Sequence, residues 1–89
     1  MKLQFIKNVQ FTKLIKVNGR LREFNFRKPN NSDQSPFSID VIDEWGSRVM
    51  FHMKKAEGEW KLVQPDLPKW ILENENTLRS LIMDELKED

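Results

Sequence analysis

Hydrophobic and polar residues alternate along the first two thirds of the chain, which is typical of β-strands that bury one face. An apolar residue at every second position places those side chains on one side of a strand and leaves the polar ones on the other. The pattern predicts five strands, at Val9–Val17, Arg20–Arg27, Phe37–Val41, Val49–Met53 and Glu59–Val63.

The dipeptide Asn18-Gly19 separates the first two strands. Asn-Gly favours a two-residue hairpin turn, because both turn residues must adopt positive φ. Such a turn pairs Val17 with Arg20 and collects the apolar residues of both strands on one face. Those residues are Val9, Phe11, Ile15, Val17, Phe24 and Phe26. A three-residue turn would scatter the phenylalanines over both faces, so we expect the two-residue register.

The second hairpin is predicted to turn at Glu44-Trp45-Gly46. A three-residue loop closed by a glycine in the left-handed conformation places Val41 opposite Val49 and keeps the apolar residues of both strands together. A four-residue loop would put them on opposite faces. A third turn near Ala56-Glu57-Gly58 leads into the last strand, where Trp60 and Leu62 should face the core.

A helical segment is predicted after the sheet, over residues 67–87. Pro65 and Pro68 interrupt the strand pattern, and Asp66 or Leu67 should cap a helix with Pro68 in its first turn. The polar residues near Asn74 leave two alternatives open. Either one helix runs to about residue 87, or a short helix breaks near Asn74 and restarts with Asn76 as its cap.

These elements predict a single α+β domain spanning residues 1–89. We expect an antiparallel meander of about five strands within residues 3–64, with a C-terminal helix, broken or continuous, packed on one face. Residues 28–36 contain two prolines and a polar run, which predicts a flexible surface loop. Trp60 and Trp70 should fill the space between sheet and helix.

The composition excludes several classes of protein. The chain has no cysteine, so it has no disulfide and no thiol nucleophile. No apolar signal-peptide core occurs in residues 1–11, and no run approaches the roughly 18 apolar residues of a membrane span. We therefore expect a cytoplasmic protein without a membrane segment, of the small single-domain kind found in bacteria.

Candidate chemistry is sparse. His52 is the only histidine, and the register brings it near Ser38 and Asp40 on the outward face. An open sheet face offers no oxyanion donors for a hydrolase, and one imidazole falls short of a zinc site. The acidic pairs Asp43-Glu44 and Asp84-Glu85 lack calcium-loop spacing. We expect no catalytic residue, no cofactor and no metal, so the chain is predicted not to be an enzyme.

Charge is distributed unevenly. Residues 1–30 carry eight basic groups and one acid, whereas the remaining residues carry seven basic groups and thirteen acids. A split of this kind bears on binding partners rather than on catalysis. The candidate contact residues are four cations of the first hairpin and one tryptophan in a turn: Lys16, Arg20, Arg22, Arg27 and Trp45. Trp45 either serves as a contact or folds back on a neighbouring strand.

The order of four or five strands followed by one helix is similar to a single repeat of the PUR family of nucleic-acid-binding domains. Such repeats work in pairs, so the resemblance implies dimerisation of a lone copy. The tract from Arg22-Glu23-Phe24-Asn25-Phe26 to Leu67-Pro68-Lys69-Trp70-Ile71 also resembles short uncharacterised proteins of Bacteroidetes. Neither resemblance implies particular functional residues.

The sequence therefore predicts a non-enzymatic binding or interaction module, a monomer or weak homodimer, with an unknown protein as its partner. The alternative is a nucleic-acid-binding domain that uses the basic hairpin. Phosphate contacts would come from the cations, but the phenylalanines needed for base stacking are predicted to be buried. A protein partner is therefore preferred.

Overall fold

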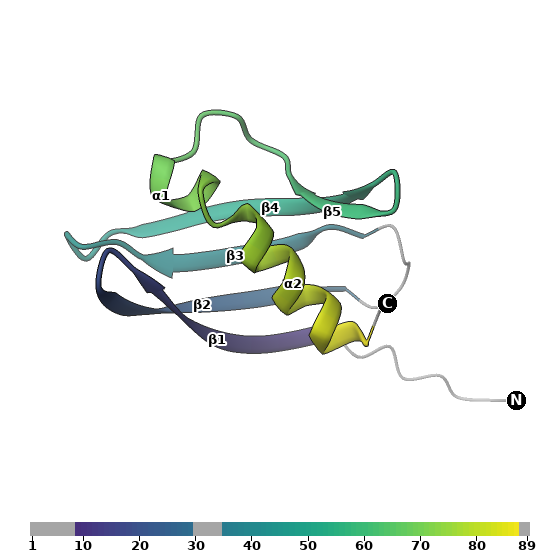
Figure 1. Ribbon diagram of the computed structural model, residues 1–89, viewed down its shortest axis with the longest axis horizontal. Helices are drawn as coiled ribbons and strands as arrows, with labels where there is room; N and C mark the ends of the chain where they lie inside the picture. Colours follow the sequence, from purple (N-terminus) through teal and green to yellow (C-terminus); the bar gives the residue numbers. More distant parts are fainter. Residues whose placement is uncertain (1–8, 30–34, 88–89) are drawn as a thin grey trace, which may run out of the picture.

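The computed structural model describes residues 9–29 and 35–87. Five antiparallel strands lie in chain order, β1-β2-β3-β4-β5, and two helices follow (Figure 1). The elements are β1 (Val9–Val17), β2 (Arg20–Lys28), β3 (Phe37–Ile42), β4 (Arg48–Ala56), β5 (Glu59–Leu62), α1 (Lys69–Leu72) and α2 (Glu75–Leu86). The antiparallel meander with C-terminal helical structure agrees with the predicted α+β class.

The first hairpin has the predicted two-residue turn. Asn18 and Gly19 have φ values of 51° and 82°, and Val17 lies opposite Arg20. The same register places Phe11 opposite Phe26, and these two rings stack with their centroids 4.5 Å apart. Turn chemistry and burial therefore specify the same register, and the prediction is confirmed.

The second hairpin is also confirmed, with Val41 opposite Val49. Gly46 has a φ of 83°, and its backbone N–H donates to the carbonyl oxygen of Asp43 over 3.1 Å. The Asp43 carboxylate accepts the backbone N–H groups of Trp45 and Ser47 at 2.9 and 2.8 Å. Asp43 thus fixes the turn that carries Trp45.

The helical segment is broken, as the second alternative predicts, but its details differ. Asn74, not Asn76, precedes α2, and Asn76 lies within the first turn of that helix. The Asn74 side-chain amide donates to the carbonyl oxygen of Trp70 over 2.6 Å, and the backbone carbonyl of Asn74 accepts the Leu78 N–H over 2.9 Å. One residue therefore ends α1 and starts α2. Neither Asp66 nor Leu67 caps α1, because Pro68 occupies the N-cap position.

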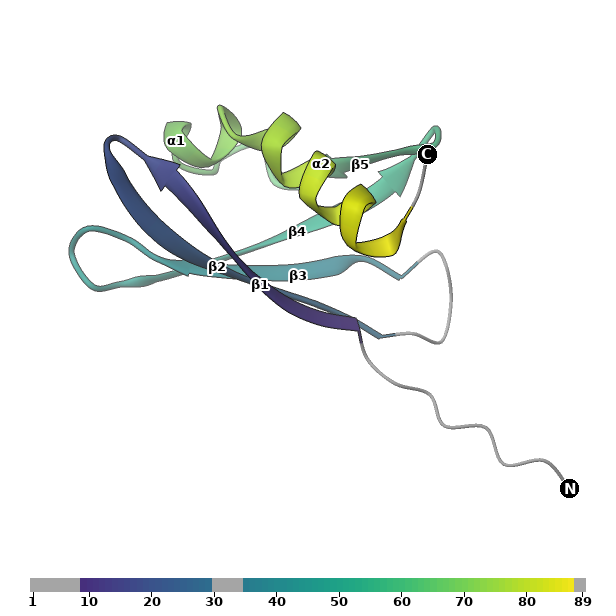
Figure 2. The same cartoon turned by 60° about the horizontal axis from the view of Figure 1, so that its bottom comes forward.

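The helices cover one face of the sheet, which we call the helix face. Figure 2 shows the sheet curving toward them, with α2 crossing above the strands. The side chains between the two layers form one core. The fully buried members include Phe24, Phe26, Phe37, Ile39, Val41, Phe51, Met53, Trp60, Ile71, Leu78 and Ile82. Trp60 is buried as predicted, and Trp70 is half-buried with its ring edge-on to Phe24.

The predicted loop at residues 28–36 begins one residue too early. Lys28 is the last residue of β2, lies opposite Val9 and is 4% exposed. Pairing with β1 extends the strand to this lysine, whose ammonium group bonds the Pro29 carbonyl over 3.2 Å. The remainder of the loop prediction falls mainly on residues 30–34, outside the described residues. In the described ranges, neither helix is long and apolar enough to cross a membrane.

Candidate interaction surface on the open face of the sheet

The face of the sheet opposite the helices, called the open face here, carries the side chains that alternate with the core. Strand pairing aligns them in rows across β1 to β4. In chain order they are Gln10, Thr12, Leu14, Lys16, Leu21, Glu23, Asn25, Arg27, Ser38, Asp40, Ile42, Arg48, Met50, His52 and Lys54. The helices lie on the opposite side of the sheet and do not cover this face.

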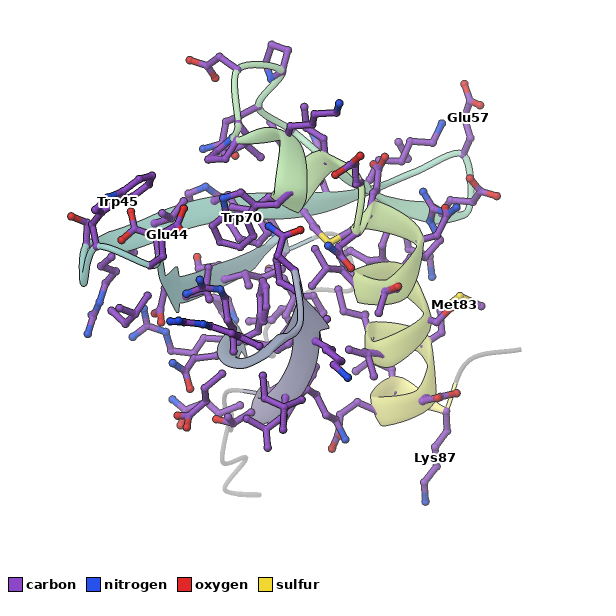
Figure 3. The ribbon with its side chains drawn as sticks, turned by 60° about the vertical axis from the view of Figure 1, so that its left-hand side comes forward. Glu44, Trp45, Glu57, Trp70, Met83 and Lys87 are labelled. Atoms are coloured by element: carbon purple, nitrogen blue, oxygen red, sulfur yellow. The ribbon has the colours of Figure 1, made fainter. Side chains whose placement is uncertain are left out.

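Four large apolar side chains are exposed on the open face: Leu14, Leu21 and Ile42 toward the β1–β2 and β3–β4 turns, and Met50 opposite Asp40. Leu14, Leu21, Ile42 and Met50 are exposed by 62%, 66%, 45% and 50%, and Trp45 of the β3–β4 turn is exposed by 80%. We call these five residues the apolar patch. In Figure 3 Trp45 projects from the turn at the end of the sheet, beside Glu44. Trp45 therefore does not fold back on a strand.

A polar ladder crosses the middle of the open face. The Thr12 hydroxyl donates to the side-chain carbonyl of Asn25 over 2.8 Å, and the Asn25 amide donates to the Asp40 carboxylate over 2.9 Å. Arg27 lies 3.7 Å from the other oxygen of that carboxylate. Asp40 is only 6% exposed, so these partners compensate the cost of burying its charge.

An open hollow of about 290 Å³ lies along the ladder. Its polar lining comes from Gln10, Thr12, Asn25, Arg27, Asp40 and Arg48. Two guanidinium groups there accompany one carboxylate, so the hollow suits an acidic or amide side chain of a bound chain. Over the open face of the five strands, the cations Lys16, Arg27, Arg48, Lys54 and Lys61 outnumber the acids Glu23, Asp40 and Glu59.

The residues of the predicted Ser38–His52–Asp40 trio lie as the register requires, with Ser38 opposite His52 on neighbouring strands. The Asp40 carboxylate, however, is bonded toward β2 by Asn25 and Arg27, away from β4 and His52. Within residues 9–29 and 35–87, no group of three or more histidines and acids lies close enough to hold a metal ion.

The structure divides the predicted basic hairpin between two faces. Lys16 and Arg27 lie on the open face, whereas Arg20 and Arg22 pair with buried residues of β1 and lie on the helix face. Arg22 donates to the carbonyl oxygen of Ile42 over 3.0 Å and stacks 5.7 Å from the centre of the Trp70 ring. Its guanidinium therefore joins β2 to β3 and α1. Of the predicted residues, Lys16 and Arg27 remain on the open face, and Trp45 is exposed in the β3–β4 turn.

Sequence reasoning missed Leu14, Leu21, Ile42, Met50 and Arg48. The signal was available for Leu14, Leu21 and Met50, because the predicted registers place them at outward positions of strands, whereas Ile42 and Arg48 lie one residue beyond the predicted strand bounds. Three large apolar residues at outward positions depart from the alternation that defines a half-buried sheet. This departure is what identifies the apolar patch.

Comparison of the chain with protein-family models, with curated proteins and with solved structures found no match. The resemblances to a PUR repeat and to short bacterial proteins stay predictions.

Proposed function

We propose that this domain is a non-enzymatic interaction module that binds a protein partner through the open face. The apolar patch carries the proposal. Small folded proteins rarely expose contiguous large apolar side chains, and where they do the patch commonly marks an interaction site. Trp45 is the natural anchor, since tryptophan is enriched among the residues that dominate binding energy.

The surroundings of the patch fit a protein partner. The polar ladder holds Thr12, Asn25 and Asp40 in fixed positions next to the apolar side chains. An apolar centre beside fixed hydrogen-bonding groups is the usual composition of a protein interface. Because these groups are already ordered, a partner that meets them loses less conformational entropy on binding.

Nucleic-acid binding is the second candidate, favoured by the excess of cations on the open face. Two observations make nucleic-acid binding the weaker candidate. Arg20 and Arg22 lie on the helix face, so the four hairpin cations do not track one backbone. Among the aromatic residues that the structure describes, only Trp45 is exposed, whereas single-strand binders stack successive bases on several rings.

Selection of random dodecapeptides displayed on phage against the immobilised domain tests the proposal. Enriched peptides are then titrated against purified variants. Trp45→Ala should weaken binding about tenfold or more, as for a central aromatic anchor, and Ile42→Thr by severalfold. Leu72→Gln is the matched control, because Leu72 is a 39% exposed apolar residue of α1 and lies outside the open face. Its affinity should stay within about twofold of the parent.

Fluorescein-labelled single-stranded oligonucleotides are titrated against the same variants to test the nucleic-acid alternative. Enrichment of no peptide above the bare support would contradict the proposal, as would peptides that respond to Leu72→Gln but not to Trp45→Ala. Oligonucleotide binding that is tighter than peptide binding and falls steeply with salt would favour nucleic-acid binding over protein binding. Circular dichroism of each variant verifies that the fold is retained.

A further inference from the structure

The two edges of the sheet are treated differently by the rest of the chain. At the β5 edge, the Glu75 carboxylate accepts the Leu62 backbone N–H over 2.8 Å, and the Arg79 guanidinium donates to the Trp60 carbonyl oxygen over 2.8 Å. Both side chains come from α2 and lie 3.9 Å from each other. Helix side chains thus occupy backbone groups that would otherwise accept another strand.

The β1 edge has no such cover among the described residues, and Figure 1 shows β1 at the margin of the sheet. Val17 and Arg20 flank a two-residue turn, so they form a hydrogen-bonded pair, and every second residue of β1 back from Val17 also bonds to β2. The backbone N–H and C=O groups of the intervening residues point away from the sheet. Those residues are Gln10, Thr12, Leu14 and Lys16.

The side chains along this edge add a chemical preference. Leu14 stands in the middle of the free stretch with Leu21 diagonal to it, and both are more than half exposed. A strand added beside β1 would cover Leu14 directly. Lys13 is already paired with Glu85 of α2 at 3.3 Å, whereas no described residue forms an ion pair with Lys16.

The charge of β1 distinguishes between possible occupants. The strand carries two lysines and no acid. Lys13 already has Glu85 as its partner, so Lys16 is the cation that an added strand would meet, and a second copy of β1 has no acid to place opposite it. An acidic segment of another protein supplies the missing charge. Polar and charged side chains at a sheet edge also prevent unwanted strand pairing. The experiment must therefore show whether the β1 edge binds an acidic strand or excludes strands altogether.

We propose that an extended acidic segment of a protein partner adds to the free edge of β1 as a sixth strand. This proposal rests on the proposed function and specifies the partner and its mode of binding. Side chains on one face of an added strand repeat every second residue. The segment therefore carries an acidic residue facing Lys16 and, two positions away, an apolar residue facing Leu14. Main-chain hydrogen bonds hold the segment, and these two side chains select it.

The test uses two synthetic octapeptides built from threonine and valine, one with a glutamate and a leucine two positions apart and the other with lysine in place of the glutamate. Each is titrated into the ¹⁵N-labelled domain. The glutamate peptide should bind and slow hydrogen exchange at Gln10, Thr12, Leu14 and Lys16 about tenfold or more, because their N–H groups become bonded. The lysine peptide should bind about threefold or more weakly, and Lys16→Glu should reverse this order.

Leu14→Pro tests the backbone directly. The Leu14 N–H points away from β2, so proline removes a donor to the added strand without removing a bond of the hairpin. We expect affinity for the glutamate peptide to fall about tenfold or more, against a smaller loss for Leu14→Ala, which keeps the N–H. Should Leu14→Pro unfold the domain, the charge reversal with Lys16→Glu still decides, since it predicts a gain of binding by the lysine peptide.

The results distinguish an error in the strand-addition proposal from an error in the proposed function. If phage-selected peptides respond to Trp45→Ala but leave exchange at Thr12 and Leu14 unchanged, strand addition is wrong and open-face binding stands. If the glutamate peptide does not bind, or if Lys16→Glu leaves the preference between peptides unchanged, the proposal is overturned. A dimer of the domain in sedimentation that dissociates on Leu14→Pro would identify a second copy as the occupant and also overturn it.

Discussion

Asp40 is a buried carboxylate on the side of the sheet that the helices leave open. It is 6% exposed, accepts a hydrogen bond from Asn25 at 2.9 Å and has the Arg27 guanidinium 3.7 Å away. A charge with so little exposure must be compensated by such partners. Asp40 therefore aligns the side chains of three strands and gives the open face a fixed polar centre.

Replacement of Asp40 measures the strength of this ladder. Asp40→Ala removes the acceptor of the part-buried Asn25 amide and should lower the free energy of unfolding by about 1–3 kcal/mol. Asp40→Asn retains a side-chain oxygen and should cost less. Urea denaturation of both variants gives the comparison. An alanine variant as stable as the parent would mean that the ladder contributes nothing to the fold.

Gly46 is a second position where one residue determines local geometry. Its φ is +83°, and a Cβ at that position would have no atom within 4 Å, so any loss on substitution reports backbone conformation alone. Gly46→Ala should destabilise the domain by about 1 kcal/mol. Thermal unfolding checks this value, with Glu44→Ala as the control in the same turn. Equal stability of Gly46→Ala and the parent would show that the turn tolerates an L-residue.

At the scale of elements, α2 has two roles, which neighbouring residues of one helix face carry. Leu78 and Ile82 are fully buried against the sheet. Glu75 and Arg79 instead reach the backbone of β5 and occupy its edge. The helix therefore both completes the core and occupies backbone groups at the β5 edge of the sheet.

The edge role of Glu75 can be isolated by mutation. Glu75→Ala leaves the part-buried Leu62 N–H without this acceptor and should cost about 1–3 kcal/mol of stability. Hydrogen exchange at Leu62 should accelerate in the same variant. Asp84→Ala, an exposed acid of the same helix, is the control and should change stability by less than about 0.5 kcal/mol. Unaltered exchange at Leu62 would contradict the assigned contact.

The hairpins were predictable because their registers depend on local chemistry. Asn18-Gly19 and Gly46 require positive φ, and the flanking alternation accepts one register at each turn. The residue at the helix break was not predictable from the sequence. Asn74 bonds to Trp70 before the break and to Leu78 after it, but Asn76 has the same side chain two positions later. Local pattern alone cannot rank two asparagines two positions apart.

The candidate site was predictable in part for a related reason. Lys16 and Arg27 lie on the open face, as their positions in the register indicate, and Trp45 is exposed in the β3–β4 turn. Arg22 does not act with them, because its guanidinium bonds to Ile42 and stacks on Trp70, and both contacts depend on how β3 and α1 pack. Contacts between elements distant in sequence therefore decided which cations face outward.

At the scale of the whole molecule, the fold partly mixes the charges that are separated along the sequence. The segment from α1 to α2 carries four acids, Glu73, Glu75, Asp84 and Glu85, against Lys69 and Arg79. The strand cations Lys13, Arg20 and Arg22 lie on the same helix face, and Lys13 pairs with Glu85. The open face carries more cations than acids, and this excess favours the approach of an acidic partner to it.

The most direct test is a map of backbone amide shifts on the ¹⁵N-labelled domain as a phage-selected peptide is added. The account predicts that the largest shifts fall on Leu14, Leu21, Ile42, Met50 and the Trp45 indole N–H, because these groups form the exposed apolar surface. Residues on the outer side of α2, such as Asp84, should not move. Largest shifts on α1 and α2, with the open face unchanged, would contradict the assignment of the open face as the binding surface.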